Sequence, residues 1–165
     1  MLHSIRLSAL AAAVLVALAT AASARDYTVG SLKINHPWSR ATPKGASVAS
    51  GYMTITNTGT TPDRLTGGST DAAKKFEIHE MSMEGSVMKM RELPSGLEIP
   101  PGKTVELKPG SYHVMMTGIA KPFVKGEHVK ASLDFEKAGK IVVEFDVQAA
   151  GAAPMPMPMP MEHKQ

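Results

Sequence analysis

The stretch that decides the fold is residues 129–147, which read VKASLDFEKAGKIVVEFDV. Apolar side chains occupy every second position in residues 129–135 and again in residues 141–147, and the turn Lys-Ala-Gly separates the two segments. Alternation with a period of two is typical of a strand with one buried and one solvated face. Two such strands joined by a short turn predict a β-hairpin.

Similar short segments precede this hairpin, and glycine- and proline-containing turns separate them. No segment has the 3.6-residue apolar spacing of an amphipathic helix. Many short strands at this spacing predict a single all-β domain, built as a Greek-key β-sandwich or barrel. We expect the earlier strands at residues 32–35, 49–57, 64–67, 75–81, 86–91, 104–107 and 111–117.

The amino-terminal segment has the pattern of a secretory signal peptide. Arg6 precedes an uncharged apolar stretch at residues 7–19, and Ala-Ser-Ala at residues 22–24 fits a cleavage site. The stretch is shorter than the roughly 20 apolar residues that span a bilayer, and no later run approaches that length. We expect a signal peptide at 1–24, an exported domain at 25–149 without a membrane span, and a tail at 150–165.

The composition excludes several classes of protein. The chain has no cysteine, so it has no disulfide framework, thiol nucleophile or cysteine-based zinc site. Its formal net charge of +3 is too small and too evenly spread to indicate nucleic-acid binding. We find no Ser-His-Asp pattern, paired carboxylates or phosphate-binding loop, so we do not expect an enzyme.

Histidine and methionine gather in two short segments, HEMSM at residues 79–83 and HVMM at residues 113–116. Imidazole and thioether ligands without thiolates favour a soft monovalent metal, and copper(I) is the leading candidate. Residues i and i+2 of a strand share a face about 6.6 Å apart, so each His-x-Met pair presents both ligands on one side. Spacing alone does not decide whether the two pairs converge.

The carboxy-terminal tail alternates methionine with proline. Proline at every second position prevents helix and sheet hydrogen bonding, which predicts a flexible, extended segment. One interpretation is low-complexity sequence drift. The other is an accessory copper-capture element, whose ligands would be Met155, Met157, Met159, Met161 and His163.

These residues resemble the PCuAC family of periplasmic copper chaperones. The family pattern is a histidine, a methionine eleven positions later and a distal His-x-Met, which His79, Met90, His113 and Met115 match. Twenty-two residues separate Met90 from His113, one more than in the family pattern, so Met88 stays open as an alternative to Met90. The resemblance covers about residues 34–147, with family-like segments at 36–40, 51–57, 63–65, 87–91 and 107–115.

The resemblance implies a cupredoxin-like β-sandwich that binds one Cu(I) through His79, Met90, His113 and Met115. Met81 and Met88 would be auxiliary ligands, and a Met/His tail could add Cu(II) binding. It also implies delivery of copper to the copper A centre of cytochrome c oxidase, either to subunit II or through a thiol-bearing assembly factor. We expect a monomer.

Two other copper functions can be compared with delivery on the basis of these ligands. Sequestration of copper for tolerance would use the same ligands, so it stays an alternative to delivery. A blue-copper electron-transfer protein is excluded because its site requires a cysteine thiolate.

Overall fold

The computed structural model describes residues 25–152, which form eleven β-strands and no helix. No helix that could cross a membrane is therefore found in this part of the chain. The prediction of a single all-β domain is confirmed. The strands are β1 (Asp26–Val29), β2 (Leu32–Arg40), β3 (Val48–Asn57), β4 (Asp63–Ser69), β5 (Lys75–Glu84), β6 (Val87–Glu92), β7 (Leu97–Ile99), β8 (Thr104–Leu107), β9 (His113–Thr117), β10 (His128–Phe135) and β11 (Gly139–Gln148).

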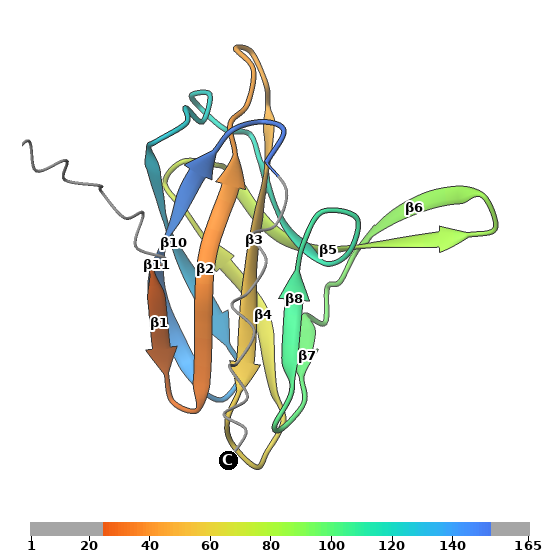
Figure 1. Ribbon diagram of the computed structural model, residues 1–165, viewed down its shortest axis with the longest axis vertical. Coiled ribbons are helices and arrows are strands. Elements are labelled where there is room, and N and C mark those ends of the chain that lie inside the picture. The colour runs from red at the N-terminus through yellow and green to blue at the C-terminus, as the bar shows by residue number, and fades with distance from the viewer. Residues whose placement is uncertain (1–24, 153–165) are drawn as a thin grey trace, which may run out of the picture.

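The strands form one hydrogen-bonded path in the order β6-β5-β9-β3-β2-β11-β10-β4-β7, with β1 added to β2 and β8 added to β3. All pairings are antiparallel except that of β11 with β2. The path folds over on itself, so that β4 and β10 lie behind β2 and β3 (Figure 1). The buried apolar side chains fill the space between the two layers. This is the predicted Greek-key, cupredoxin-like sandwich.

The carboxy-terminal hairpin forms as predicted, with β10 and β11 paired from His128–Asp146 to Phe135–Gly139. The side chains of one β10 face, from Val129 to Phe135, are buried. On β11, Phe145 is fully buried and its near neighbour Val142 is exposed. Burying one face of each strand against the opposite layer supplies the hydrophobic stabilisation of the sandwich.

The observed strands differ from the predicted ones mainly at their ends. Strand β2 continues past the expected end at residue 35 because a bulge at His36 and Pro37 carries the ladder to Trp38. His36 has a φ of 48° there, and a bulge tolerates such a residue without ending the pairing. Two short strands, β1 and β7, were not predicted, since only pairing with β2 and β4 orders them.

The β5–β6 hairpin extends away from the sandwich (Figure 1). Its turn contains Gly85 at a φ of 64°, a left-handed conformation that glycine adopts without a steric penalty. Every residue of β6 is exposed. The hairpin therefore contributes little to the core and presents both of its faces to solvent beyond the point where β5 pairs with β9.

Candidate metal centre

The register of β5 on β9 brings the two predicted histidine ligands together. His79 lies directly opposite His113, and the two ring centroids are 5.8 Å apart with the rings inclined by 40°. The two histidines are 34 positions apart in the sequence and belong to different strands. This juxtaposition therefore comes from the sheet, and it answers the question of convergence that spacing alone left open.

The two predicted thioether ligands lie on the same face, at positions diagonal to His79. Met115 pairs with Glu77, which is two residues before His79. Met90 pairs with Met81, which is two residues after His79. Directly opposed and i, i+2 residues of antiparallel strands point to one side, and diagonal neighbours lie about 7–8 Å apart, within reach of long side chains. His79, Met90, His113 and Met115 therefore share one face.

Met90 lies closer to His79 in the ladder than Met88 does. Met88 pairs with Met83, one same-face step further toward the tip of the hairpin. Met81 shares its strand and face with His79 and is half-buried. The register thus favours Met90 as the fourth ligand, and it places Met81 beside the group as an auxiliary thioether.

Hydrogen bonding leaves one nitrogen of each histidine free for a metal. His113 Nδ1 lies 3.0 Å from the carbonyl oxygen of Ser111, so Nδ1 carries the donated proton and Nε2 keeps its lone pair. His79 Nε2 lies 3.4 Å from a carboxylate oxygen of Glu77, while its Nδ1 is buried without a hydrogen-bond partner. A buried polar atom without a partner is unusual, and metal binding would satisfy His79 Nδ1.

The environment of His113 favours its neutral form. Burial lowers the pKa of His113, the hydrogen bond to the Ser111 carbonyl opposes this shift, and the nearby His79 lowers the pKa further. A neutral imidazole is the form that binds metals. His113 is therefore ready to act as a ligand at neutral pH without losing a proton.

Glu77 was not predicted as a functional residue, although the sequence placed it on the same strand face as His79. A carboxylate that accepts a hydrogen bond from the N–H of a metal-binding histidine orients the ring and raises its basicity. The alternation of side chains between the two faces of β5 was the sequence signal that could have pointed to Glu77. The contact with His79 Nε2 could be recognised only once side-chain positions were known.

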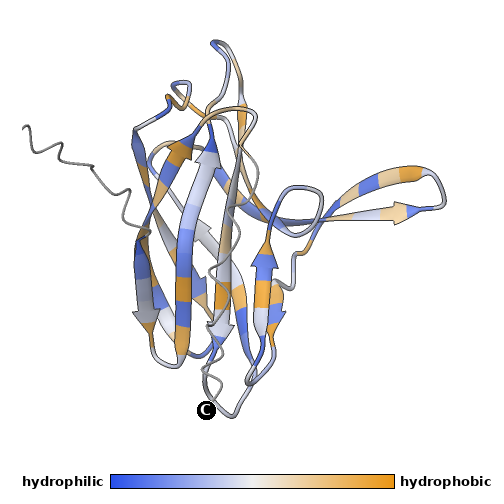
Figure 2. Cartoon of the chain, in the orientation of Figure 1, coloured by the Kyte–Doolittle hydropathy of each residue, from blue (hydrophilic) through white to orange (hydrophobic). Residues whose placement is uncertain are grey.

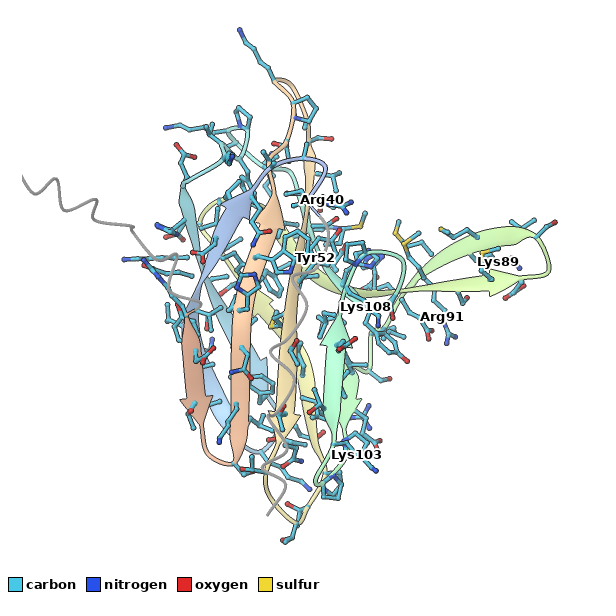
Figure 3. All side chains as sticks on the ribbon, viewed as in Figure 1. Arg40, Tyr52, Lys89, Arg91, Lys103 and Lys108 are labelled. Carbon is cyan, nitrogen blue, oxygen red and sulfur yellow. The ribbon has the colours of Figure 1, made fainter. Side chains whose placement is uncertain are left out.

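An aromatic and cationic group borders the face of the site. Ser50 of β3 pairs with Met115, and Tyr52 is two residues further on the same face of β3. The Tyr52 ring packs at 4.6 Å on Trp38, and the Arg40 guanidinium lies 5.9 Å from the Tyr52 centroid. Figure 3 shows Arg40 and Tyr52 close together in front of the sheet. Trp38 and Tyr52 are both buried, as expected of side chains that pack in the fold.

Two histidines that were left out of the predicted site lie elsewhere. His36 Nε2 accepts a hydrogen bond from the Gln148 amide at 3.0 Å, and His128 pairs with Asp146 at 2.7 Å. Between residues 25 and 152, no three His, Cys, Asp or Glu side chains come together in a metal-binding arrangement. The predicted signal peptide and the tail ligands, Met155, Met157, Met159, Met161 and His163, lie outside the described residues.

Comparisons by sequence identify the family. A model described as "LpqE-like: Putative lipoprotein LpqE-like" matches residues 32–147. The curated "Putative lipoprotein Lxx21020" of Leifsonia xyli subsp. xyli is 30% identical over 104 residues, which are 63% of this chain and 61% of that protein. The chain thus matches about three fifths of the length of this relative.

Solved structures with the same fold include PCuAC domains. The copper-bound PCuAC domain from PmoF2 is 31% identical, with 76% of this chain and 98% of that chain covered and a TM-score of 0.65. The Cu(I) form of DR1885 from Deinococcus radiodurans is 27% identical, with 77% and 83% covered and a TM-score of 0.56. The sequence match and the shared fold agree, and the chain belongs to the LpqE-like family with a domain of the PCuAC type.

Proposed function

We propose that this protein is a periplasmic copper chaperone that binds one Cu(I) ion through His79, Met90, His113 and Met115. The observation that carries the proposal is the register that sets His79 opposite His113, with both thioethers on the same face. Structural neighbours named as copper-bound and Cu(I) forms support the choice of metal.

The ligand chemistry suits Cu(I). Two imidazoles and two thioethers are neutral donors, and the thioethers select a soft monovalent ion over hard divalent ions. The unpaired Nδ1 of His79 and the free Nε2 of His113 supply the nitrogen lone pairs. The protein binds and passes on the metal, and we assign it no reaction of its own.

The partial exposure of the site favours delivery over storage. His113 is buried, but Met90 is exposed and Met115 is half-buried, so an acceptor can replace the thioethers first. A thiolate is a stronger ligand for Cu(I) than a thioether, so the ion would pass to a cysteine-bearing acceptor. We propose the copper A centre of cytochrome c oxidase as the destination, reached through subunit II or a thiol-bearing assembly factor.

The periplasmic location and the role of the tail are part of the same proposal. The signal-like residues 1–24 support export, and the matched family and relative, which are both named as lipoproteins, support a place in the cell envelope. The tail from Met155 to Met161 would gather copper for the main site. Deleting the residues after Ala150 should lower copper stoichiometry or the transfer rate, and no change in either would contradict the tail's role.

Anaerobic Cu(I) titration against a competing chelator tests the main site. The wild-type protein should bind one Cu(I) tightly at this site, and His79→Ala and Met115→Ala should each weaken that binding. His128→Ala is the matched control, since this exposed histidine lies away from the site. Tight binding that survives both site substitutions would overturn the assignment.

A genetic experiment separates delivery from sequestration. If the protein delivers copper, deleting its gene should reduce cytochrome c oxidase activity in copper-limited cells, and added copper should restore it. If the protein sequesters copper, deletion should leave oxidase activity unchanged and should reduce growth at high copper. The second result would replace delivery with sequestration as the function.

A further inference from the structure

The projecting β5–β6 hairpin has two chemically distinct faces. One face holds four methionines in two directly opposed pairs, Met81 with Met90 and Met83 with Met88. The other face is charged. There Arg91 pairs with Glu80 at 2.6 Å, and Lys89 pairs with Glu84. Figure 2 shows the resulting alternation along the hairpin, and Figure 3 shows Arg91 on the side opposite the sulfur atoms.

The outer methionines do not fill a core. Met83, Met88 and Met90 are 59%, 57% and 49% exposed, whereas a methionine in a protein usually fills a gap between packed side chains. Strand propensity does not explain them either, because strands favour β-branched and aromatic residues. Met90 has a role in the proposed main site, so the exposed thioethers of Met83 and Met88 on the same hairpin face require another explanation.

The spacing of these methionines allows their sulfur atoms to meet over one ion. Directly opposed residues have Cβ atoms about 4.5–5.5 Å apart, and same-face neighbours along a strand are about 6.6 Å apart. The unbranched methionine side chain spans such gaps with three rotatable bonds. If Met90 is engaged with His79, then Met81, Met83 and Met88 remain as a three-thioether set.

We propose that Met81, Met83 and Met88 form a second soft-metal site, which binds a monovalent ion such as Cu(I) or Ag(I) through sulfur alone. The set lies next to Met90 in the ladder and at the exposed end of the ligand face. The site depends on the proposed function only for the identity of its natural ion, since the three thioethers can bind Ag(I) whether or not the histidine site is used.

The two sites are adjacent, because Met81 of the second site pairs with Met90 of the main site. The second site could therefore load the main site with metal. An ion on the hairpin can move inward by ligand substitution. Its bonds to Met83 and Met88 break as bonds to Met90 and His79 form. The oxidation state of the metal stays constant, and no proton is transferred if His79 is neutral. The hairpin would thus capture ions from solvent and pass them to the partly buried site.

The test is Ag(I) titration of the full protein carrying 13C-labelled methionine methyl groups, followed by NMR. The wild-type protein should show saturable shifts of the Met81, Met83 and Met88 methyl signals, with Met53 and Met116 as buried internal references. The double variant Met83→Leu/Met88→Leu should bind one equivalent fewer than the wild-type protein. Val87→Leu, on the charged face of the same hairpin, should bind as many equivalents as the wild-type protein.

Each result separates this proposal from the main function. In His79→Ala, hairpin methyl shifts that persist at the same Ag(I) concentrations support the second site, and their loss overturns it. An unchanged stoichiometry in Met83→Leu/Met88→Leu also overturns it, and this exposed, volume-conserving variant remains informative if His79→Ala fails to fold. If the hairpin shifts appear while Cu(I) binding is insensitive to His79→Ala and Met115→Ala, the main site fails and the second site stands.

Discussion

Replacing Glu77 with glutamine tests whether this carboxylate orients His79 for metal binding. The substitution keeps the shape of the side chain and removes its charge, so His79 Nε2 loses its charged acceptor. Loss of such an orienting partner typically costs 10- to 100-fold in metal affinity. The distance from His79 Nε2 to the Glu77 carboxylate is 3.4 Å, longer than the usual 2.7–2.9 Å of a charge-assisted hydrogen bond. We therefore expect the lower limit, about tenfold or about 1.4 kcal/mol.

The assay is anaerobic Cu(I) titration against a chelator at constant pH, with Glu80→Gln as the control. Glu80 is the same residue type on the same strand, but it faces the other way and pairs with Arg91. Glu80→Gln should leave the affinity unchanged, because an exposed ion pair contributes little. Unchanged or tighter Cu(I) binding in Glu77→Gln would refute the reasoning, since it would mean that Nε2 of His79, not Nδ1, faces the metal.

Three further predictions follow from the same geometry. The pKa of His113 is lowered in the folded protein, so the unfolded chain binds a proton at this imidazole more readily. The free energy of unfolding, measured by urea denaturation, should therefore fall as pH drops below about 6.5. An equal fall in the His113→Gln variant would contradict this prediction. Met90→Leu should weaken Cu(I) binding in the chelator titration more than Met88→Leu does, and the reverse order would show that Met88 is the ligand. Gly51→Ala places a Cβ 2.8 Å from the Phe145 ring, so it should lower the free energy of unfolding by about 1–3 kcal/mol. Urea denaturation checks this, and no loss of stability would show that the Phe145 ring can move aside.

Partial exposure of the proposed ligands links the structure to the metal exchange that a chaperone requires. A fully enclosed site would hold copper firmly but would leave no path for an acceptor's thiolate. Here the histidines lie where β5 pairs with β9, and Met90 lies on the projecting hairpin. Histidine positions are therefore fixed by two neighbouring strands, while the thioether on the hairpin is accessible for substitution.

Much of the fold could be predicted because its signals are local. The alternation in residues 129–147 predicted the β10–β11 hairpin and its buried face, and the structure confirms both. The strands β1 and β7 were missed because each is only three or four residues long and depends on its partner strand. Similarly, the extension of β2 to Arg40 depends on a bulge that follows from pairing with β3.

The chain's own pattern was sufficient to predict an all-β domain, to propose a soft-metal ligand set and to place each proposed ligand on one face of its strand. Period-two alternation and ligand chemistry are properties of neighbouring residues, so they can be read without knowing the fold. The approach of His79 to His113, the diagonal positions of Met90 and Met115, and the contact of Glu77 with His79 required the folded sheet. These contacts depend on strand register, and register is determined by how distant strands pair and bury their apolar faces together.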